Sequence, residues 1–355
     1  MKRLDTYIQK LSKKVNVLHV QLESPNQNIS YTYQKDLKKD IFHSASIGKL
    51  FCATLVMMAI DEKHIKLETK VYDILKKGML DMLYIYKNID YQKDVTVEML
   101  LSHTSGVNDY FEGKTINHQP FIKMVLSNKD HLFTKEELLD FTRFHQQAVS
   151  KPGDKFLYSD TGYILLGEML ESIYQMPYEQ ILKTKIFNPL HMPHTKLCFY
   201  DPSFDQKDLA PLYFNGIEMS QAKSLSCDYA GGGLQTTTKD LSVFMNALFN
   251  GTLIPNDLLY KMMDVKHSFH GIMRYGLGMI EVLFHRLAPW LRGYPKLYGG
   301  LGSLSVFAFY DPKEKDTYII NLGDSRKMRI GFLLLIQMAS TLKKIRKGKR
   351  HGSRN

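Results

Sequence analysis

Apolar and polar positions in the first part of the chain predict a helix followed by a β-hairpin. Residues 1–14 are typical of a short basic helix, and apolar and polar side chains alternate over residues 15–22 as in a strand. Residues 25–28 contain the turn formers Pro and Asn, and a second short strand follows near residues 29–33. We therefore expect the hairpin to follow directly on the helix.

The middle of the chain is expected to be mostly helical. Residues 47–60 are nearly all apolar and form too long a run for one strand, so they predict a buried helix. Four further segments have helical patterns: 97–101, 135–144, 161–173 and 178–186.

The pattern changes near residue 230, where three consecutive glycines precede a helix entry at residues 236–241. Strands are expected to dominate after residue 275. Residues 304–310 and 316–322 flank a turn at 311–314, as neighbouring antiparallel strands do. Residues 330–342 predict a final helix.

Strands at both ends with helices between them predict an α+β protein, in which an antiparallel sheet is flanked by helices. We expect residues 1–48 and 230–345 to form this sheet domain together. Residues 49–229 would form an inserted, mostly helical domain, and residues 346–355 a disordered basic tail.

Composition places the chain among globular proteins of enzyme size. Its 355 residues are 44% hydrophobic and 23% charged, which excludes a disordered, collagen-like or disulfide-rich protein. The three cysteines form no C-x-x-C pair, and the histidine pairs at i, i+3 have no carboxylate nearby that would complete a metal set. No Walker or dinucleotide motif surrounds the glycine run, so we expect neither a metal nor a cofactor.

The net charge of +11 would favour anionic partners, but part of it lies in residues 343–350. Because blocks of like charge usually stay solvated, we expect no nucleic acid partner and, as the alternative, a weak contact with an anionic surface. Residues 1–10 are polar before any apolar segment of secretory type, and no stretch reaches about 18 apolar residues, so a cytoplasmic protein is expected.

The candidate nucleophile lies in the run Ser46-Ile47-Gly48-Lys49, at the start of the apolar helix. Side chains three residues apart share a helix face, so a desolvated Lys49 could accept the serine proton. Two other Ser-x-x-Lys runs, at 220–223 and 340–343, match the same spacing. Spacing alone therefore does not choose among the three.

The context of Ser46 resembles the serine β-lactamase and penicillin-binding-protein superfamily, specifically its class C and esterase-like branch. The resemblance spans about residues 40–325 and implies the β-lactamase/transpeptidase-like fold. It makes Ser46 the nucleophile and Lys49 its neighbour on the nucleophile helix. The segments that carry it occur in the family's order at residues 41–51, 95–107, 152–167, 188–192 and 230–241.

By the same resemblance, Tyr158 matches the tyrosine that moves the proton between the serine and the leaving group. Two literal Tyr-x-Asn runs, at 86–88 and 213–215, lack the family's context, whereas Tyr158-Ser159-Asp160 has it and carries Asp in the third place. A negative Asp160 beside Lys49 favours the ammonium form, which leaves Tyr158 as the better base. Asp160 is also expected to line the substrate site.

The third family motif, Lys-Thr-Gly or His-x-Gly on a strand, has its best match at Tyr298-Gly299-Gly300. The resemblance implies that these three residues contact the substrate and that the backbone N–H groups of Ser46 and Leu301 hold the oxyanion. A cation at the first position helps to bind a substrate carboxylate. Its replacement by Tyr298 favours a neutral ester or amide.

The sequence thus predicts a serine hydrolase that forms an acyl-enzyme on Ser46 and acts on a small ester, amide or peptide substrate. One alternative is a D-alanyl-D-alanine carboxypeptidase or β-lactamase, which the missing cation disfavours. The other is a catalytically inactive homologue that acts as a binding protein, because Asp160 and Tyr298 depart together from the family pattern. Neither the substrate nor the oligomeric state follows from the sequence.

Overall fold

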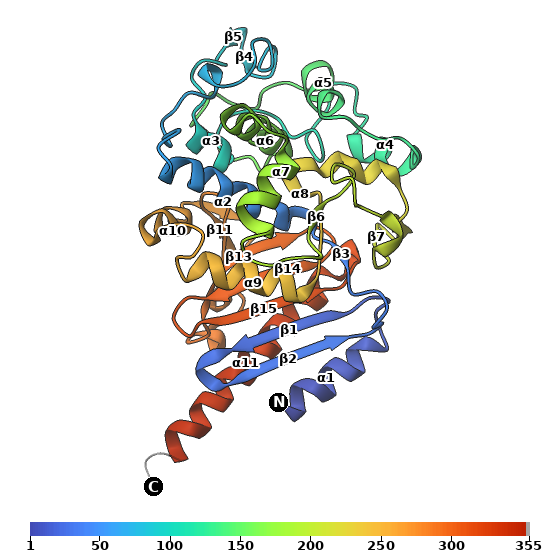
Figure 1. Ribbon diagram of the computed structural model, residues 1–355, viewed down its shortest axis with the longest axis vertical. Coiled ribbons are helices and arrows are strands. Elements are labelled where there is room, and N and C mark those ends of the chain that lie inside the picture. The colour runs from blue at the N-terminus through green and yellow to red at the C-terminus, as the bar shows by residue number, and fades with distance from the viewer. Residues whose placement is uncertain (353–355) are drawn as a thin grey trace.

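An eight-stranded antiparallel sheet forms the lower half of the computed structural model, which describes residues 1–352 (Figure 1). The strand order is β10-β11-β12-β13-β14-β15-β1-β2, so β1 from the start of the chain pairs with β15 from its end, one strand away from the β2 edge. Val20 pairs with Ile320 at this junction. The strands are β1 (His19–Ser24), β2 (Ile29–Gln34), β10 (His267–Phe269), β11 (Met273–Tyr275), β12 (Ile280–Leu283), β13 (Lys296–Gly302), β14 (Val306–Asp311) and β15 (Asp316–Asn321).

Helices cover both faces of the sheet, so its central strands are buried on both sides. Phe307 and Phe309 of β14 pack with α1 (Lys2–Ser12) and α11 (Met328–Gly352). The alternate residues Val306 and Ala308 pack in the other core, to which α9 (Thr238–Phe249) contributes. The period of two in a strand therefore divides the apolar side chains between two cores.

Above the sheet lies a helical layer that supplies the other half of the functional site (Figure 1). Its helices are α2 (Gly48–Asp61), α3 (Val97–Leu101), α4 (Phe121–Ser127), α5 (Lys135–His145), α6 (Asp160–Tyr174), α7 (Tyr178–Leu182), α8 (Tyr229–Gly232) and α10 (Asn256–Met263). The remaining strands are short: β3 (Phe42–His43), β6 (Lys196–Leu197) and β9 (Leu234–Thr236) form one small sheet, and two hairpins are formed by β4 (Ile85–Tyr86) with β5 (Ile89–Asp90) and by β7 (Tyr213–Phe214) with β8 (Ile217–Glu218).

Helix α2 is buried on nearly all sides, which explains its uninterrupted apolar sequence. It packs against α6 and α8 and against the 3-10 turn Ala45–Ile47 that precedes it. Lys49, in its first turn, is only 1% exposed. A lysine so deeply buried requires partners in the protein, and these define the site described below.

The α+β prediction is confirmed, as are the N-terminal helix and hairpin and the buried helix after residue 47. The C-terminal tail differs from the prediction, because α11 continues to Gly352. Arg346 anchors this extension through ion pairs with Glu314 and the buried Asp316. Residues 353–355 of the predicted tail lie outside the described residues, and the exact domain boundaries stay a prediction.

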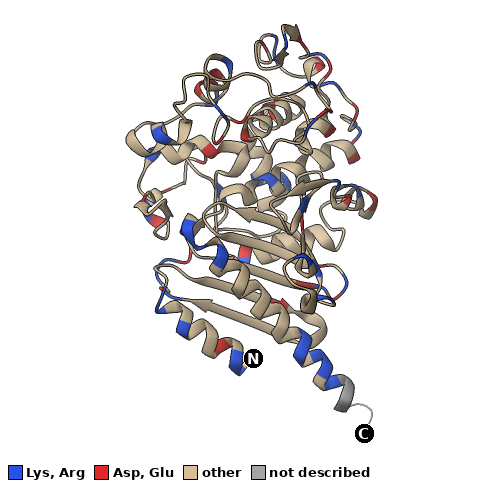
Figure 2. Ribbon diagram, turned by 180° about the vertical axis from the view of Figure 1, so that it is seen from behind, with Lys and Arg blue, Asp and Glu red and all other residues tan. Residues whose placement is uncertain are grey.

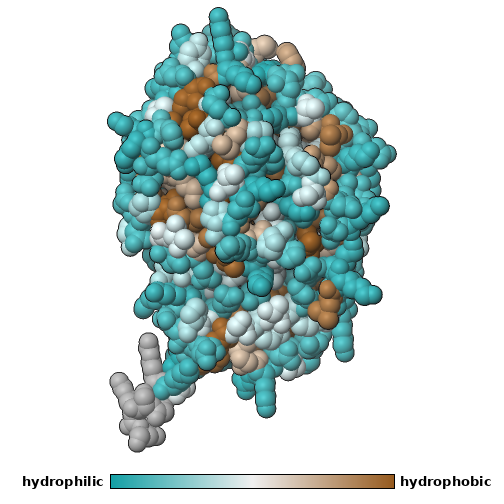
Figure 3. Space-filling model, viewed as in Figure 1, coloured by the Kyte–Doolittle hydropathy of each residue, from teal (hydrophilic) through white to brown (hydrophobic). Residues whose placement is uncertain are grey.

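The molecular surface is mostly hydrophilic on the face seen in Figure 3, with small and separated apolar patches. None of the helices within residues 1–352 combines the length and apolar character that a bilayer crossing demands.

Candidate active site

Ser46 lies in a single 3-10 turn, Ala45–Ile47, that leads directly into α2. Ala45 has a φ of 49°, a left-handed conformation that is strained for a residue with a side chain. Two hydrogen bonds hold the turn: the Ala45 amide donates to His43 Nδ1 over 3.2 Å, and Ser44 Oγ donates to the Gly232 carbonyl over 3.1 Å. The turn therefore presents Ser46 at the start of the helix, as a nucleophile requires.

Lys49 follows Ser46 by one helical turn and is held by two acceptors. Its ammonium contacts the Asp160 carboxylate and donates a hydrogen bond of 2.8 Å to the Gly231 carbonyl. Gly231 is required by this close packing, since a Cβ there would lie 2.5 Å from Asp160 Oδ1. The charge that Asp160 adds beside Lys49 is thus paired directly with the ammonium.

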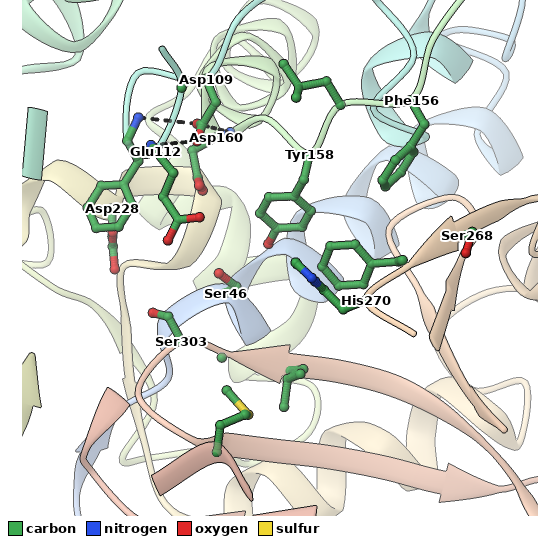
Figure 4. Close-up of a pocket in the computed structure, with 17 residues that line it drawn as sticks. Ser46, Asp109, Glu112, Phe156, Tyr158, Asp160, Asp228, Ser268, His270 and Ser303 are labelled. Atoms are coloured by element: carbon green, nitrogen blue, oxygen red, sulfur yellow. Dashed lines mark hydrogen bonds between the residues drawn. The ribbon is translucent and has the colours of Figure 1, made fainter. Parts of the chain in front are cut away.

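Tyr158 lies on the other side of Ser46, and Figure 4 shows its hydroxyl pointing toward the serine. Its ring packs 4.4 Å from His103 and stacks at 5.3 Å on Phe269, measured between ring centroids, and Lys49 Nζ lies 4.8 Å from its centroid. Loss of water and then the charge of Asp160 raise the pKa of Tyr158 well above its ordinary value, although a hydrogen bond with Ser46 opposes this. The hydroxyl therefore stays protonated at neutral pH.

A cluster of carboxyl groups surrounds the lysine. The Asp160 amide donates to Asp109 Oδ1 over 2.8 Å, and the Glu112 amide donates to Asp109 Oδ2 over 2.8 Å. Burial and then the charge of Asp160 raise the pKa of both Asp109 and Asp228 to about 7. His43 Nε2 lies 3.8 Å from Asp228 Oδ2, and burial lowers the pKa of His43 to about 4. Two of these carboxyl groups therefore titrate near neutral pH.

These residues open onto a cavity of about 520 Å³ between the helical layer and the end of β13 (Figure 4). Four carboxyl residues contribute to its wall, whereas none of its lining residues within the described part of the chain is Lys or Arg. Aromatic rings form much of the remainder. The lining residues are Ser46, Asp109, Phe111, Glu112, Gly113, Phe156, Leu157, Tyr158, Asp160, Asp228, Ser268, Phe269, His270, Leu301, Gly302, Ser303 and Met328.

Strand β13 lines the cavity at a different point from the predicted one. Tyr298, Gly299 and Gly300 are absent from the cavity wall, and the Tyr298 hydroxyl instead donates to Glu281 over 2.8 Å beside a second cavity. Leu301, Gly302 and Ser303 reach the site, and Figure 4 shows the Ser303 side chain beside Ser46.

Close packing against the nucleophile turn explains this register. A Cβ at Gly302 would lie 2.8 Å from the Ser44 carbonyl oxygen, and one at Gly300 would lie 3.1 Å from Ile47 Cδ1. The run Gly300-Leu301-Gly302 therefore supplies the two glycines that the strand needs here. Sequence reasoning missed Ser303. Matching the family motif to Gly300-Leu301-Gly302 instead of Tyr298-Gly299-Gly300 would have placed Ser303 in the site.

Asp109, Glu112 and Asp228 were also missed, because they come from loops without a recognised motif. The structure does bring Ser46, Lys49, Tyr158 and Asp160 together, and Leu301 lines the cavity with Ser46. Their catalytic roles, including the oxyanion roles of the Ser46 and Leu301 amides, stay predictions.

A serine turn on a buried helix, a lysine one turn later and a tyrosine across the cavity, all beside an antiparallel sheet, define the β-lactamase-like class of proteins. The chain belongs to the Beta-lactamase family, whose model matches residues 35–338. The resemblance seen in the sequence is thereby confirmed.

Curated relatives share part of the chain. Penicillin-binding protein 4 of Amycolatopsis lactamdurans is 27% identical over 150 residues, which are 42% of this chain and 34% of the relative. Penicillin-binding protein 4* of Bacillus subtilis is 28% identical over 167 residues, which are 47% of this chain and 33% of the relative. The chain thus matches about a third of the length of these two relatives.

Solved structures match nearly the whole chain. D-amino acid amidase from Ochrobactrum anthropi SV3, in complex with L-phenylalanine, has a TM-score of 0.79 and 22% identity and covers 97% of this chain and 99% of its own. EstCE1, described as a hydrolase with promiscuous acyltransferase activity, has a TM-score of 0.74 and 16% identity, with coverages of 96% and 98%. At these identities the likeness establishes the fold.

Proposed function

We propose that this protein hydrolyses an ester or amide bond through an acyl-enzyme on Ser46. We further propose that its substrate carries a protonated amine near the scissile carbonyl and no carboxylate there. The observation that supports this most directly is the acidic lining of the cavity: Lys49 pairs with Asp160, but Asp109, Glu112 and Asp228 face no Lys or Arg among the lining residues within the described part of the chain.

In the proposed reaction, Ser46 Oγ attacks the carbonyl carbon and its proton passes to the Tyr158 oxygen, while Tyr158 gives its own proton to the leaving nitrogen or oxygen. Tyr158 then remains a neutral phenol throughout, in agreement with its raised pKa. Water attacks the acyl-enzyme in the second step, the same groups return its proton to Ser46, and the acid is released.

The electrostatics of the cavity favour a cationic substrate. A substrate ammonium beside Asp109, Glu112 or Asp228 would gain Coulomb energy, whereas a carboxylate would meet like charge. Phe111, Phe156 and Phe269 supply apolar walls for a hydrophobic side chain. An amino acid amide or ester satisfies both requirements. D-amino acid amidase, which has the same fold, is described in complexes with phenylalanine and phenylalanine amide.

Matched substrates test the proposal. We expect phenylalanine amide, as one or both enantiomers, to have a kcat/KM at least tenfold above that of N-acetylphenylalanine amide, which lacks the ammonium. The Asp228→Asn and Glu112→Gln double variant should reduce this preference. Equal rates on both amides would contradict the role of the ammonium, and faster turnover of an acyl-D-alanyl-D-alanine peptide would favour the carboxypeptidase alternative.

A fluorophosphonate separates an active enzyme from an inactive homologue. We expect one covalent adduct on the parent protein, seen by intact mass, and none on a Ser46→Ala variant of unchanged circular dichroism. A well-folded parent without an adduct would favour the binding-protein alternative.

A further inference from the structure

The loop between β12 and β13 and the end of α11 carry exposed apolar side chains and unpaired basic ones. Trp290, the chain's single tryptophan, is 81% exposed, and Leu287 three residues earlier is 48% exposed. Leu287 directly follows the 3-10 turn Phe284–Arg286, and Trp290 lies in the next 3-10 turn, Pro289–Leu291. Isolated exposed apolar residues are common, but these two neighbours are held outward together.

The loop that carries Trp290 is anchored from below. Phe284 and Leu291 are buried in the core between the sheet and α11, and Phe284 packs edge-on to Tyr294 with ring centroids 5.8 Å apart. Because buried residues fix both turns, Trp290 cannot fold back into the core without breaking this packing. The exposure of its indole is thus built into the loop.

Basic side chains surround the loop. Arg286 and Arg292 flank Trp290 on the exposed side of the chain, and Lys343 of α11 lies with its Nζ 4.5 Å from the Tyr294 ring centroid. Figure 2 shows that Lys and Arg residues gather along the C-terminal part of α11.

Between the loop, the start of β13 and α11 lies a cavity of about 550 Å³. Its charged lining residues are Lys296, Lys313, Lys343, Arg346, Lys347, Asp311 and Glu314. Glu314 pairs with Arg346 at 3.2 Å, and among the described residues no carboxylate pairs with Lys313, Lys343 or Lys347. The cavity therefore presents an excess of free ammonium groups.

We propose that this region docks on an anionic membrane surface, with lipid phosphates entering the lysine-lined cavity and Leu287 and Trp290 inserting among the headgroups. We define this Trp290 surface by Arg286, Leu287, Trp290, Arg292, Lys296, Lys343 and Lys347. Indole rings favour the membrane–water interface, since one end is apolar and the N–H is polar. Lysines and arginines beside them attract the negative leaflet.

None of the described residues lines both the lysine-lined cavity and the catalytic cavity. That cavity is lined by Met328 at the start of α11, whereas the Trp290 surface uses Lys343 and Lys347 near its end. At 1.5 Å per residue, the fifteen positions from Met328 to Lys343 span about 22 Å along the helix. Figure 1 shows this end of α11 on the side of the sheet away from the helical layer.

The single tryptophan makes the test direct. Vesicles that contain equal parts of phosphatidylglycerol and phosphatidylcholine should shift the emission of Trp290 to shorter wavelength, whereas pure phosphatidylcholine vesicles should not. Binding should weaken as salt is raised. The Lys343→Gln/Lys347→Gln variant should lose about tenfold or more in vesicle affinity, and the matched variant Lys76→Gln/Lys77→Gln, which changes two exposed lysines elsewhere, should lose none.

Sedimentation with the same vesicles provides a readout that does not need the indole, so that Trp290→Ser can be measured too. Unfolding midpoints show whether each variant is folded. Equal binding of both lysine variants, or equal binding to the two vesicle types, would overturn the proposal. So would an emission shift with inorganic phosphate or an oligonucleotide that anionic vesicles fail to produce, because the ligand would then be a soluble anion.

Discussion

Replacement of Asp228 by Asn should stabilise the protein above neutral pH and leave its stability almost unchanged in acid. The pKa of Asp228 is about 7 in the folded protein against an ordinary value of 3.8, so the folded chain binds this proton more tightly. The protonated Asp228 carboxyl therefore contributes its full stabilisation of the folded state below pH 3.8, and this contribution is lost as the pH rises from there through 7. Asn cannot ionise and escapes that loss.

The magnitude follows from the two pKa values. Their difference corresponds to about 4 kcal/mol when Asp228 is fully ionised in the folded state. Because 23% of the Asp228 side chain is exposed, water screens part of this cost, and we expect about 2 kcal/mol at about pH 8. The only basic side chain within ion-pair distance of Asp228 in the described chain is His43 at 3.8 Å, and its lowered pKa of about 4 leaves it neutral at pH 8, so little else is lost with the charge.

Urea unfolding of parent and variant at about pH 3, below the unfolded-state pKa, and at about pH 8 measures this effect. The variant minus parent difference in unfolding free energy should be near zero in acid and positive in base. Asp208→Asn, which changes an exposed aspartate, is the matched control and should give the same small difference at both pH values. A difference for Asp228→Asn that does not change with pH would refute the reasoning.

Three further variants probe the site and its support. Tyr158→Phe should lower kcat/KM by about 10² to 10⁴-fold with unchanged circular dichroism, and a loss below tenfold would argue against a proton-transfer role. Gly302→Ala places a Cβ 2.8 Å from the Ser44 oxygen and should cost about 1–3 kcal/mol in urea unfolding and slow fluorophosphonate labelling; normal labelling would contradict the packing argument. Arg346→Met leaves the buried Asp316 without its ion pair and should cost about 3–5 kcal/mol, whereas an unchanged unfolding midpoint would show that the pair does not hold the end of α11.

Long periodic segments of the fold were predictable from the sequence. Residues 47–60 form a long apolar run, which predicts a buried helix. Residues 316–322 form a short apolar run beside a turn, which predicts a strand. The end of α11 was not predictable in this way. Its basic residues are typical of a solvated tail, and only the tertiary position of Asp316 shows that Arg346 has a buried partner.

The site was predictable where its residues are close in sequence. Ser46 and Lys49 share one helix face, and Tyr158 and Asp160 share one turn. Asp109 and Asp228 belong to distant loops, so their approach to Lys49 depends on the whole fold. The sequence left open which residues of β13 face the site, because the glycines at 299, 300 and 302 allow either residues 298–300 or residues 301–303 to line it. The answer depends on which glycines pack against residues 44–47, and this contact is visible only in the folded protein.

The pairing of β1 with β15 has a consequence for biosynthesis. The two strands lie about 300 residues apart in the chain, and the Asn321 side-chain amide in β15 donates a buried hydrogen bond of 3.1 Å to His19 Nδ1 in β1. At about 5–20 residues per second, a ribosome needs roughly 15–60 s to make the intervening chain. The N-terminal hairpin must wait through that interval with one edge unpaired, so a nascent chain should depend on chaperones that cover exposed strand edges until synthesis of β15 is complete.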